Sequence, residues 1–161
     1  MAALAAGALA VAGALALAGC GGGGGEKAVD VVGTGYVVSF PAGWEHRRTE
    51  LTRSAADRTS LVSVTVLPLR KPYTPALFPR VVPELNVLAA DFAKRQQGSV
   101  TDARTVVVAG RRSRQYDLLA GDSRERVTFV LRGRREFQLL CRWQRSEPPA
   151  CDLLTRSFRL R

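Results

Sequence analysis

Histidine is nearly absent from this sequence, and lysine is scarce. The 161 residues include one histidine, His46, and three lysines, whereas arginine occurs 21 times. A hydrolytic triad needs a base beside its nucleophile, and no serine lies in a G-x-S-x-G motif. A metal site built on two cysteines would need further Cys or His ligands. The sequence therefore predicts no catalytic constellation, no metal site and no cofactor, and we interpret His46 as a solvated loop residue.

Charge is absent from the N-terminal segment. Residues 1–19 are almost all Ala, Leu, Gly and Val, so they must leave water as a targeting segment or a membrane span. They end in Leu17-Ala18-Gly19-Cys20, which is followed by five glycines. This order resembles the lipobox of bacterial lipoproteins, which implies that Cys20 carries lipid and becomes the new N-terminus. The alternative is an uncleaved anchor helix, for which about 18 apolar residues with three glycines are marginal in length.

The resemblance implies a location outside the cytoplasm, anchored to the cell membrane by lipid. Residues 1–19 would then be a signal peptide, 20–32 a lipidated, glycine-rich tether, and 33–161 one folded domain. No Lys or Arg precedes the apolar run, although a secretory leader normally begins with positive charge, so we expect translation to start upstream of Met1. Two or three acyl chains would hold the protein on a bilayer.

The net charge of +10 falls entirely after residue 25. Such a basic domain can attract anionic lipid, an acidic polymer or an acidic partner protein. An excess of arginine over lysine is also typical of a GC-rich genome, in which case the charge has no binding role. An exported location argues against nucleic acid as a partner.

Two cysteines remain once Cys20 is assigned to lipid. Outside the cytoplasm, Cys141 and Cys151 are expected to form a structural disulfide. A reactive redox pair is disfavoured because the spacing is not C-x-x-C.

The first half of the domain contains two strand patterns and one helix pattern. Residues 36–40 alternate as a half-buried strand does, and 61–67 carry valine at every second position. Four prolines predict a long loop over 68–80. Apolar residues then recur at helical spacing, which predicts a helix over about 82–97.

The second half predicts a meander of four strands followed by a helix. Short, glycine-bearing connections separate the strands and are typical of hairpins. The final helix, at about 149–157, would place Cys151 on its inner face, where a bond to Cys141 joins the helix to the last strand. The four strands are expected at 101–108, 113–119, 125–131 and 135–143.

These elements carry a family resemblance. The segment from Gly35-Tyr36 to Phe40-Pro41-Ala42-Gly43-Trp44 resembles the opening "G-Y-x-x-x-x-P-x-G-W" of the PsbP-like superfamily, and the C-terminal cysteine pair is similar to small bacterial lipoproteins of that group. The resemblance implies a single α+β domain, with an antiparallel sheet of about six to seven strands and helices on both sides. It also implies an accessory or interaction protein, without transferring any binding residue.

The meander predicts one geometric feature of the surface. Alternate turns of a meander lie at the same end of the sheet, so the turn with Arg111 and Arg112 is expected beside the turn with Arg132, Arg134 and Arg135. We interpret this basic edge as a possible contact for lipid phosphate or an acidic partner. The alternative is a solvated charged face without a binding role.

Three functions follow in order of preference. The first is a non-enzymatic envelope lipoprotein that binds a protein partner as an accessory factor. The second is a carrier or sensor of a small apolar or lipid ligand, held near Trp44, Tyr73, Phe78 and the proline-rich segment. The third is an envelope hydrolase, for which the fourteen acidic residues provide no suggestive spacing.

Overall fold

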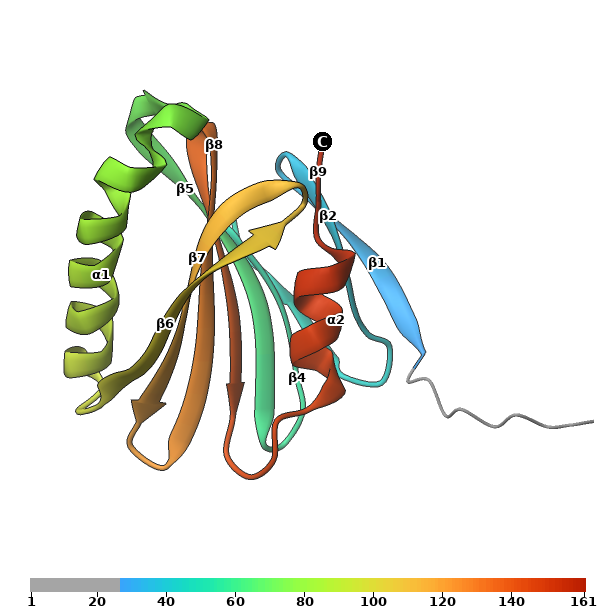
Figure 1. Ribbon diagram of the computed structural model, residues 1–161. Coiled ribbons are helices and arrows are strands. Elements are labelled where there is room, and N and C mark those ends of the chain that lie inside the picture. The colour runs from blue at the N-terminus through green and yellow to red at the C-terminus, as the bar shows by residue number, and fades with distance from the viewer. Residues whose placement is uncertain (1–26) are drawn as a thin grey trace, which may run out of the picture.

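The computed structural model describes residues 27–161 (Figure 1). The predicted signal peptide and the predicted lipid attachment at Cys20 lie outside these residues. Within 27–161, no helix is both long enough and apolar enough to cross a bilayer.

A six-stranded antiparallel sheet forms the centre of the domain, in the order β3-β4-β5-β8-β7-β6. Its inward positions carry β-branched and aromatic side chains, which suit a pleated, half-buried surface. The strands are β3 (Glu45–Arg48), β4 (Thr52–Ala56), β5 (Ser60–Tyr73), β6 (Ser99–Val108), β7 (Arg111–Ala120) and β8 (Ser123–Trp143).

Strand β8 doubles back on itself, so it contributes two neighbouring segments to the sheet. Its first part pairs with β7 and its second part with β5. Glu125 and Arg142 form an ion pair although they are 17 residues apart, which a straight strand rising about 3.3 Å per residue could not allow. The bend lies at Gly133, whose φ of +55° is readily adopted by glycine. The predicted meander, including the hairpin between 125–131 and 135–143, is confirmed.

The sheet is covered on both faces (Figure 1). Helix α1 (Phe78–Arg95) packs on one face through Leu85, Ala89 and Ala93, against aromatic and aliphatic side chains of β7 and β8. Helix α2 (Pro149–Ser157) and a small sheet cover the other face, where Tyr36 and Phe158 belong to the larger core cluster. The α+β architecture predicted from the sequence is therefore confirmed.

The small sheet has the order β1-β2-β9, formed by β1 (Ala28–Gly33), β2 (Tyr36–Pro41) and β9 (Arg159–Leu160). Strand β1 corrects the predicted tether, because residues 28–32 were assigned to it and instead pair along β2. The valines of this segment predict a strand only weakly, because Val29 and Val32 are exposed and give no alternation of buried and exposed positions. The strand forms because the segment pairs with β2.

The segment around the prolines also differs from the prediction. Strand β5 continues to Tyr73 through Pro68 and Pro72, with an irregular register there, so residues 68–73 of the predicted loop 68–80 are strand. Proline is tolerated because this part of β5 has no β4 partner and needs no donor on that side. A 3₁₀ turn, η1 (Pro75–Leu77), then leads into α1, which begins four residues earlier than predicted.

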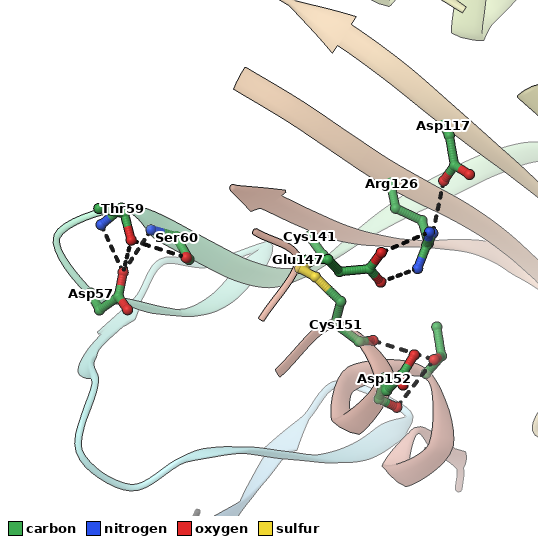
Figure 2. The surroundings of a disulfide bond; sticks show 10 residues. Asp57, Thr59, Ser60, Asp117, Arg126, Cys141, Glu147, Cys151 and Asp152 are labelled. Carbon is green, nitrogen blue, oxygen red and sulfur yellow. Dashed lines mark hydrogen bonds and ion pairs between the residues drawn. A yellow bond between two sulfur atoms is a disulfide. The ribbon is translucent and has the colours of Figure 1, made fainter. Parts of the chain in front are cut away.

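A disulfide joins β8 to α2, as predicted (Figure 2). Cys141 and Cys151 are bonded, with their Cα atoms 5.4 Å apart, and both are almost fully buried. Helix α2 has the predicted bounds, and its inner face carries Ala150, Cys151 and Leu154.

Candidate functional site

One end of the domain gathers arginine. The β6–β7 turn at Gly110, the bend of β8 at Gly133 and the β1–β2 turn at Gly35 all lie at this end, together with the C-terminal residue. We call it the arginine-rich end, and define it by Arg111, Arg112, Arg132, Arg134, Arg135 and Arg161.

The bend of β8 borders a hollow of about 370 Å³, here called the arginine pocket. Its walls carry Arg132, Arg134, Arg135 and Arg161, with Gly35 and the edge of Phe137. The η nitrogen of Arg132 donates to the backbone oxygen of Arg161 at 2.5 Å. No carboxylate side chain of residues 27–161 lines the hollow. It is therefore a concave, strongly positive surface.

Glycine at position 35 makes room for one of these guanidinium groups. A Cβ atom at Gly35 would collide with an η nitrogen of Arg135, and the φ of +84° at Gly35 is one that other residues rarely adopt. The tight turn between β1 and β2 thus allows Arg135 to lie directly on the backbone.

Arg111 and Arg112 border a neighbouring hollow of about 170 Å³ together with Tyr73. Tyr73 is also the register partner of Gly133, so this tyrosine lies between the two arginine-bearing turns. Burial raises the pKa of Tyr73, while the charges of Arg111 and Arg112 oppose that rise. The guanidinium of Arg112 lies 4.6 Å from the ring centre of Phe78, a cation–π contact.

The structure thus places the predicted basic residues in two hollows at the arginine-rich end, and Tyr73 borders the second of them. Arg161 and Gly35 belong to the first hollow, and neither was predicted. Only the pairing of β9 with β2 places Arg161 there, so no local sequence pattern could have identified it.

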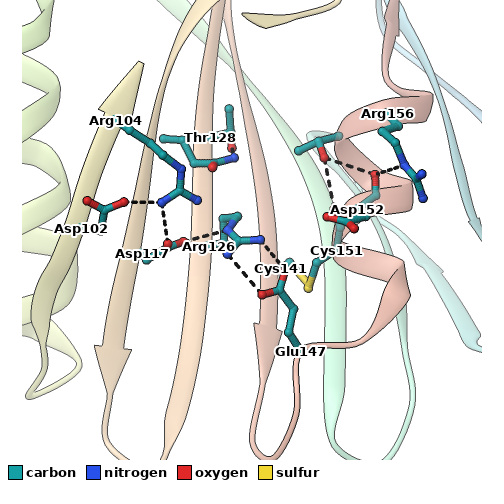
Figure 3. A network of polar contacts seen from close by, with 12 residues as sticks. Asp102, Arg104, Asp117, Arg126, Thr128, Cys141, Glu147, Cys151, Asp152 and Arg156 are labelled. Atoms are coloured by element: carbon teal, nitrogen blue, oxygen red, sulfur yellow. Dashed lines mark hydrogen bonds and ion pairs between the residues drawn. A yellow bond between two sulfur atoms is a disulfide. The ribbon is translucent and has the colours of Figure 1, made fainter. Parts of the chain in front are cut away.

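Five arginines elsewhere in residues 27–161 form salt bridges with acids, namely Arg47, Arg104, Arg126, Arg142 and Arg159. A chain of alternating charges crosses β6, β7 and β8 (Figure 3), where Asp117 accepts from Arg104 and from Arg126, each at 2.7 Å. Asp102 also binds Arg104, and Glu147 also binds Arg126. Among residues 27–161, none of the arginines named for the arginine-rich end forms a salt bridge with a side chain.

The paired carboxylates are unsuited to acid catalysis. Burial alone would raise the pKa of Asp117, but the hydrogen bonds from Arg126 and Arg104 lower it below its usual value. Glu125 is fully buried and binds Arg142, and its second oxygen accepts from Gln96 at 3.1 Å. These groups hold α1 and the loop after β8 to the sheet.

His46 lies on β3 and not in a loop as predicted. Its ring is exposed, and its ε nitrogen lies 2.9 Å from the backbone oxygen of Pro41. Within the described part of the chain, no three His, Cys, Asp or Glu side chains are arranged to hold a metal.

The aromatic residues expected near an apolar ligand are separated. Trp44 packs against the larger core cluster, and Phe78 is buried at the start of α1. Tyr73 alone borders a hollow of about 460 Å³ between β5 and α1, whose walls include Leu69, Leu77 and Val81.

Comparison with solved structures shows a likeness of fold. The solution structure of cyanobacterial PsbP (CyanoP) from Synechocystis sp. PCC 6803 matches with a TM-score of 0.61 at 15% sequence identity, covering 90% of this chain and 99% of that one. No protein-family model matches the sequence, and no curated protein matches it. At this identity the likeness establishes a PsbP-like fold.

Proposed function

We propose that the protein is a non-enzymatic lipoprotein, anchored outside the cytoplasmic membrane through Cys20, that binds an acidic partner protein with its arginine-rich end. The observation that carries this proposal is the gathering of arginines without Asp or Glu side-chain partners at one end of residues 27–161. Like charges held together repel one another and reduce the stability of the fold. A partner of opposite charge would relieve that repulsion.

The direction of the chain favours a protein partner over the lipid of the anchoring bilayer. Strand β1 begins at Ala28 and runs to Gly33, beside the arginine pocket, so about 17 Å separates its start from the arginine-rich end. From Cys20 to Lys27 the chain takes seven residue-to-residue steps, which reach about 25 Å at full extension. Because this tether is short and joins the domain at the end of β1 that lies away from the arginine pocket, it favours an orientation in which the arginine-rich end faces away from the bilayer.

The test is recovery of the partner from native membranes with the full-length, lipidated protein in mild detergent. We expect a stoichiometric acidic protein with the wild type and its loss with Arg132→Glu/Arg134→Glu/Arg135→Glu. A control with the same charge change is Arg58→Glu/Arg145→Glu/Arg156→Glu, whose residues are exposed and form no salt bridge within the described chain. Equal recovery with both triple variants would contradict the proposed interface. Release of a Cys20→Ser variant from the membrane tests the anchor separately.

A second candidate function is a carrier of a small amphiphile. It is favoured by the hollow between β5 and α1, where apolar side chains lie beside the cationic groups of Arg70, Lys71 and Arg80. A defined lipid seen by native mass spectrometry, and lost in a Val81→Glu variant, would support it. A protein that carries no ligand when purified from its own membranes would exclude it.

A further inference from the structure

The arginine pocket has a more specific geometry than a general basic surface. Three of its arginines come from one bend of β8, and the fourth is brought there by the C-terminal strand. The pocket is concave, and its described walls include no acid side chain.

The guanidinium of Arg132 is held by a hydrogen bond to the backbone, and that of Arg135 lies close to the backbone of Gly35. Arg135 occupies the space that a side chain at position 35 would fill, and Arg132 donates to the backbone oxygen of Arg161. A guanidinium that is already positioned loses less conformational freedom when a ligand binds. Its planar fork matches pairs of acidic oxygens on carboxylates and phosphates.

The number of guanidinium groups distinguishes between these two ligands. A carboxylate neutralises a single charge and offers one pair of oxygens, which would leave most of the pocket uncompensated. A phosphate carries up to two charges and presents oxygens in several directions, so it can engage groups on different walls at once.

We infer that the arginine pocket is a specific binding site for a phosphate group, with Arg132 and Arg135 as its principal ligands. The inference goes beyond the proposed function, because it requires neither the lipid at Cys20 nor a protein partner. The phosphate can belong to a soluble or polymeric phosphate ester or to a lipid headgroup, and the experiment separates these sources.

The experiment is a calorimetric titration of the full-length protein, in neutral detergent, with inorganic pyrophosphate at 50 and 150 mM salt. We expect saturable binding that weakens at least tenfold in Arg132→Gln/Arg135→Gln. The matched control, Arg145→Gln/Arg58→Gln, removes the same charge at positions outside the pocket and should change the affinity less than twofold. All variants should keep the wild-type melting temperature.

A second variant separates geometry from charge. Arg135→Lys keeps the positive charge but replaces the fork with a point charge, so we expect a loss of affinity of several-fold. Amide shifts in an NMR titration should concentrate at Gly35 and Gly133. The inference is overturned if pyrophosphate does not bind, if both double variants lose affinity equally, or if Arg135→Lys binds as the wild type does.

Competition identifies the source of the phosphate. Displacement of pyrophosphate by phosphatidylglycerol vesicles would assign the group to a lipid headgroup, whereas vesicles that do not compete assign it to a soluble or polymeric ester. Loss of pyrophosphate binding in a variant that still recovers the protein partner would support the phosphate site and contradict only the proposed protein interface.

Discussion

The disulfide offers the sharpest test of how the C-terminal part of the domain is held. Cys141 lies on the inner face of β8 and Cys151 on the inner face of α2, and both side chains are buried. Replacing both by alanine removes the covalent link between helix and sheet. All proteins compared would carry Cys20→Ser, so that no third thiol can exchange with the pair.

The expected magnitude follows from the size of the loop. The two cysteines are 10 residues apart in sequence, and closing a loop of this length reduces the entropy of the unfolded chain by an amount worth about 2.7 kcal/mol at 25 °C. For a domain of this size, that loss lowers the melting temperature by roughly 10 °C. The alanine variant should lose somewhat more, because the buried sulfur atoms also contribute packing.

The assay is urea unfolding monitored by circular dichroism, with and without a strong reductant. The free energy of unfolding of the oxidised wild type should be about 2.7 kcal/mol higher than that of the reduced wild type. Reductant should leave the alanine variant unchanged. A difference below about 1 kcal/mol between oxidised and reduced wild type, under conditions in which mass spectrometry confirms reduction, would refute the reasoning.

Three further predictions concern the core and its charges. Replacing Arg142 by methionine leaves the buried Glu125 without its cation and should lower the free energy of unfolding by about 3 kcal/mol, measured by chemical unfolding. A Glu125→Leu/Arg142→Met variant should be close to the wild type in stability, and equal losses in the two variants would contradict this. Because the folded-state pKa of Asp117 lies below the unfolded value near 3.8, its contribution to stability is present above that pH and is lost as the pH falls through the folded pKa. Stability measured from pH 6 to pH 2 should therefore converge for wild type and Asp117→Asn at the acid end, and a constant gap would contradict the linkage. Leu85→Ala removes a buried contact of α1 with the sheet and should cost 2–5 kcal/mol in the same assay, in contrast to a small effect of alanine at the exposed Val87.

The second half of the fold could be predicted well from sequence. Strands β6, β7 and β8 alternate in polarity, and their turns carry glycine, so each element is specified by its own residues. Helix α2 was predicted with its observed bounds because its apolar residues recur at helical spacing. The inward direction of Cys141 and Cys151 follows from these two local periods, whereas their pairing follows from the cysteine count and the expected location outside the cytoplasm.

The same topology predicted that the two arginine-bearing turns would share one end of the sheet, since alternate turns of a meander do so. The positions of these arginines along the chain do not predict whether they bind a ligand. The number of acids facing them depends on which other elements reach that end.

The first half depended more on tertiary contacts. Strands β1 and β3 carry mostly exposed side chains, so their polarity does not reveal them, and they form because an antiparallel neighbour supplies hydrogen bonds. Strand β5 continues through two prolines because its far half lacks a partner on one side.

The sequence by itself determined the meander and the C-terminal helix, because both depend on short-range periodicity and on the side to which a residue points. The α+β class followed from the order of these elements and the family resemblance, and the disulfide from the cysteine count and the expected compartment. Only the tertiary structure decided the form of the arginine pocket. It brings Gly35 and Arg161, 126 positions apart in the chain, to the bend of β8. The physical reason is that pairing of β2 with β9 and packing of the small sheet on the core are long-range contacts, which no local pattern encodes.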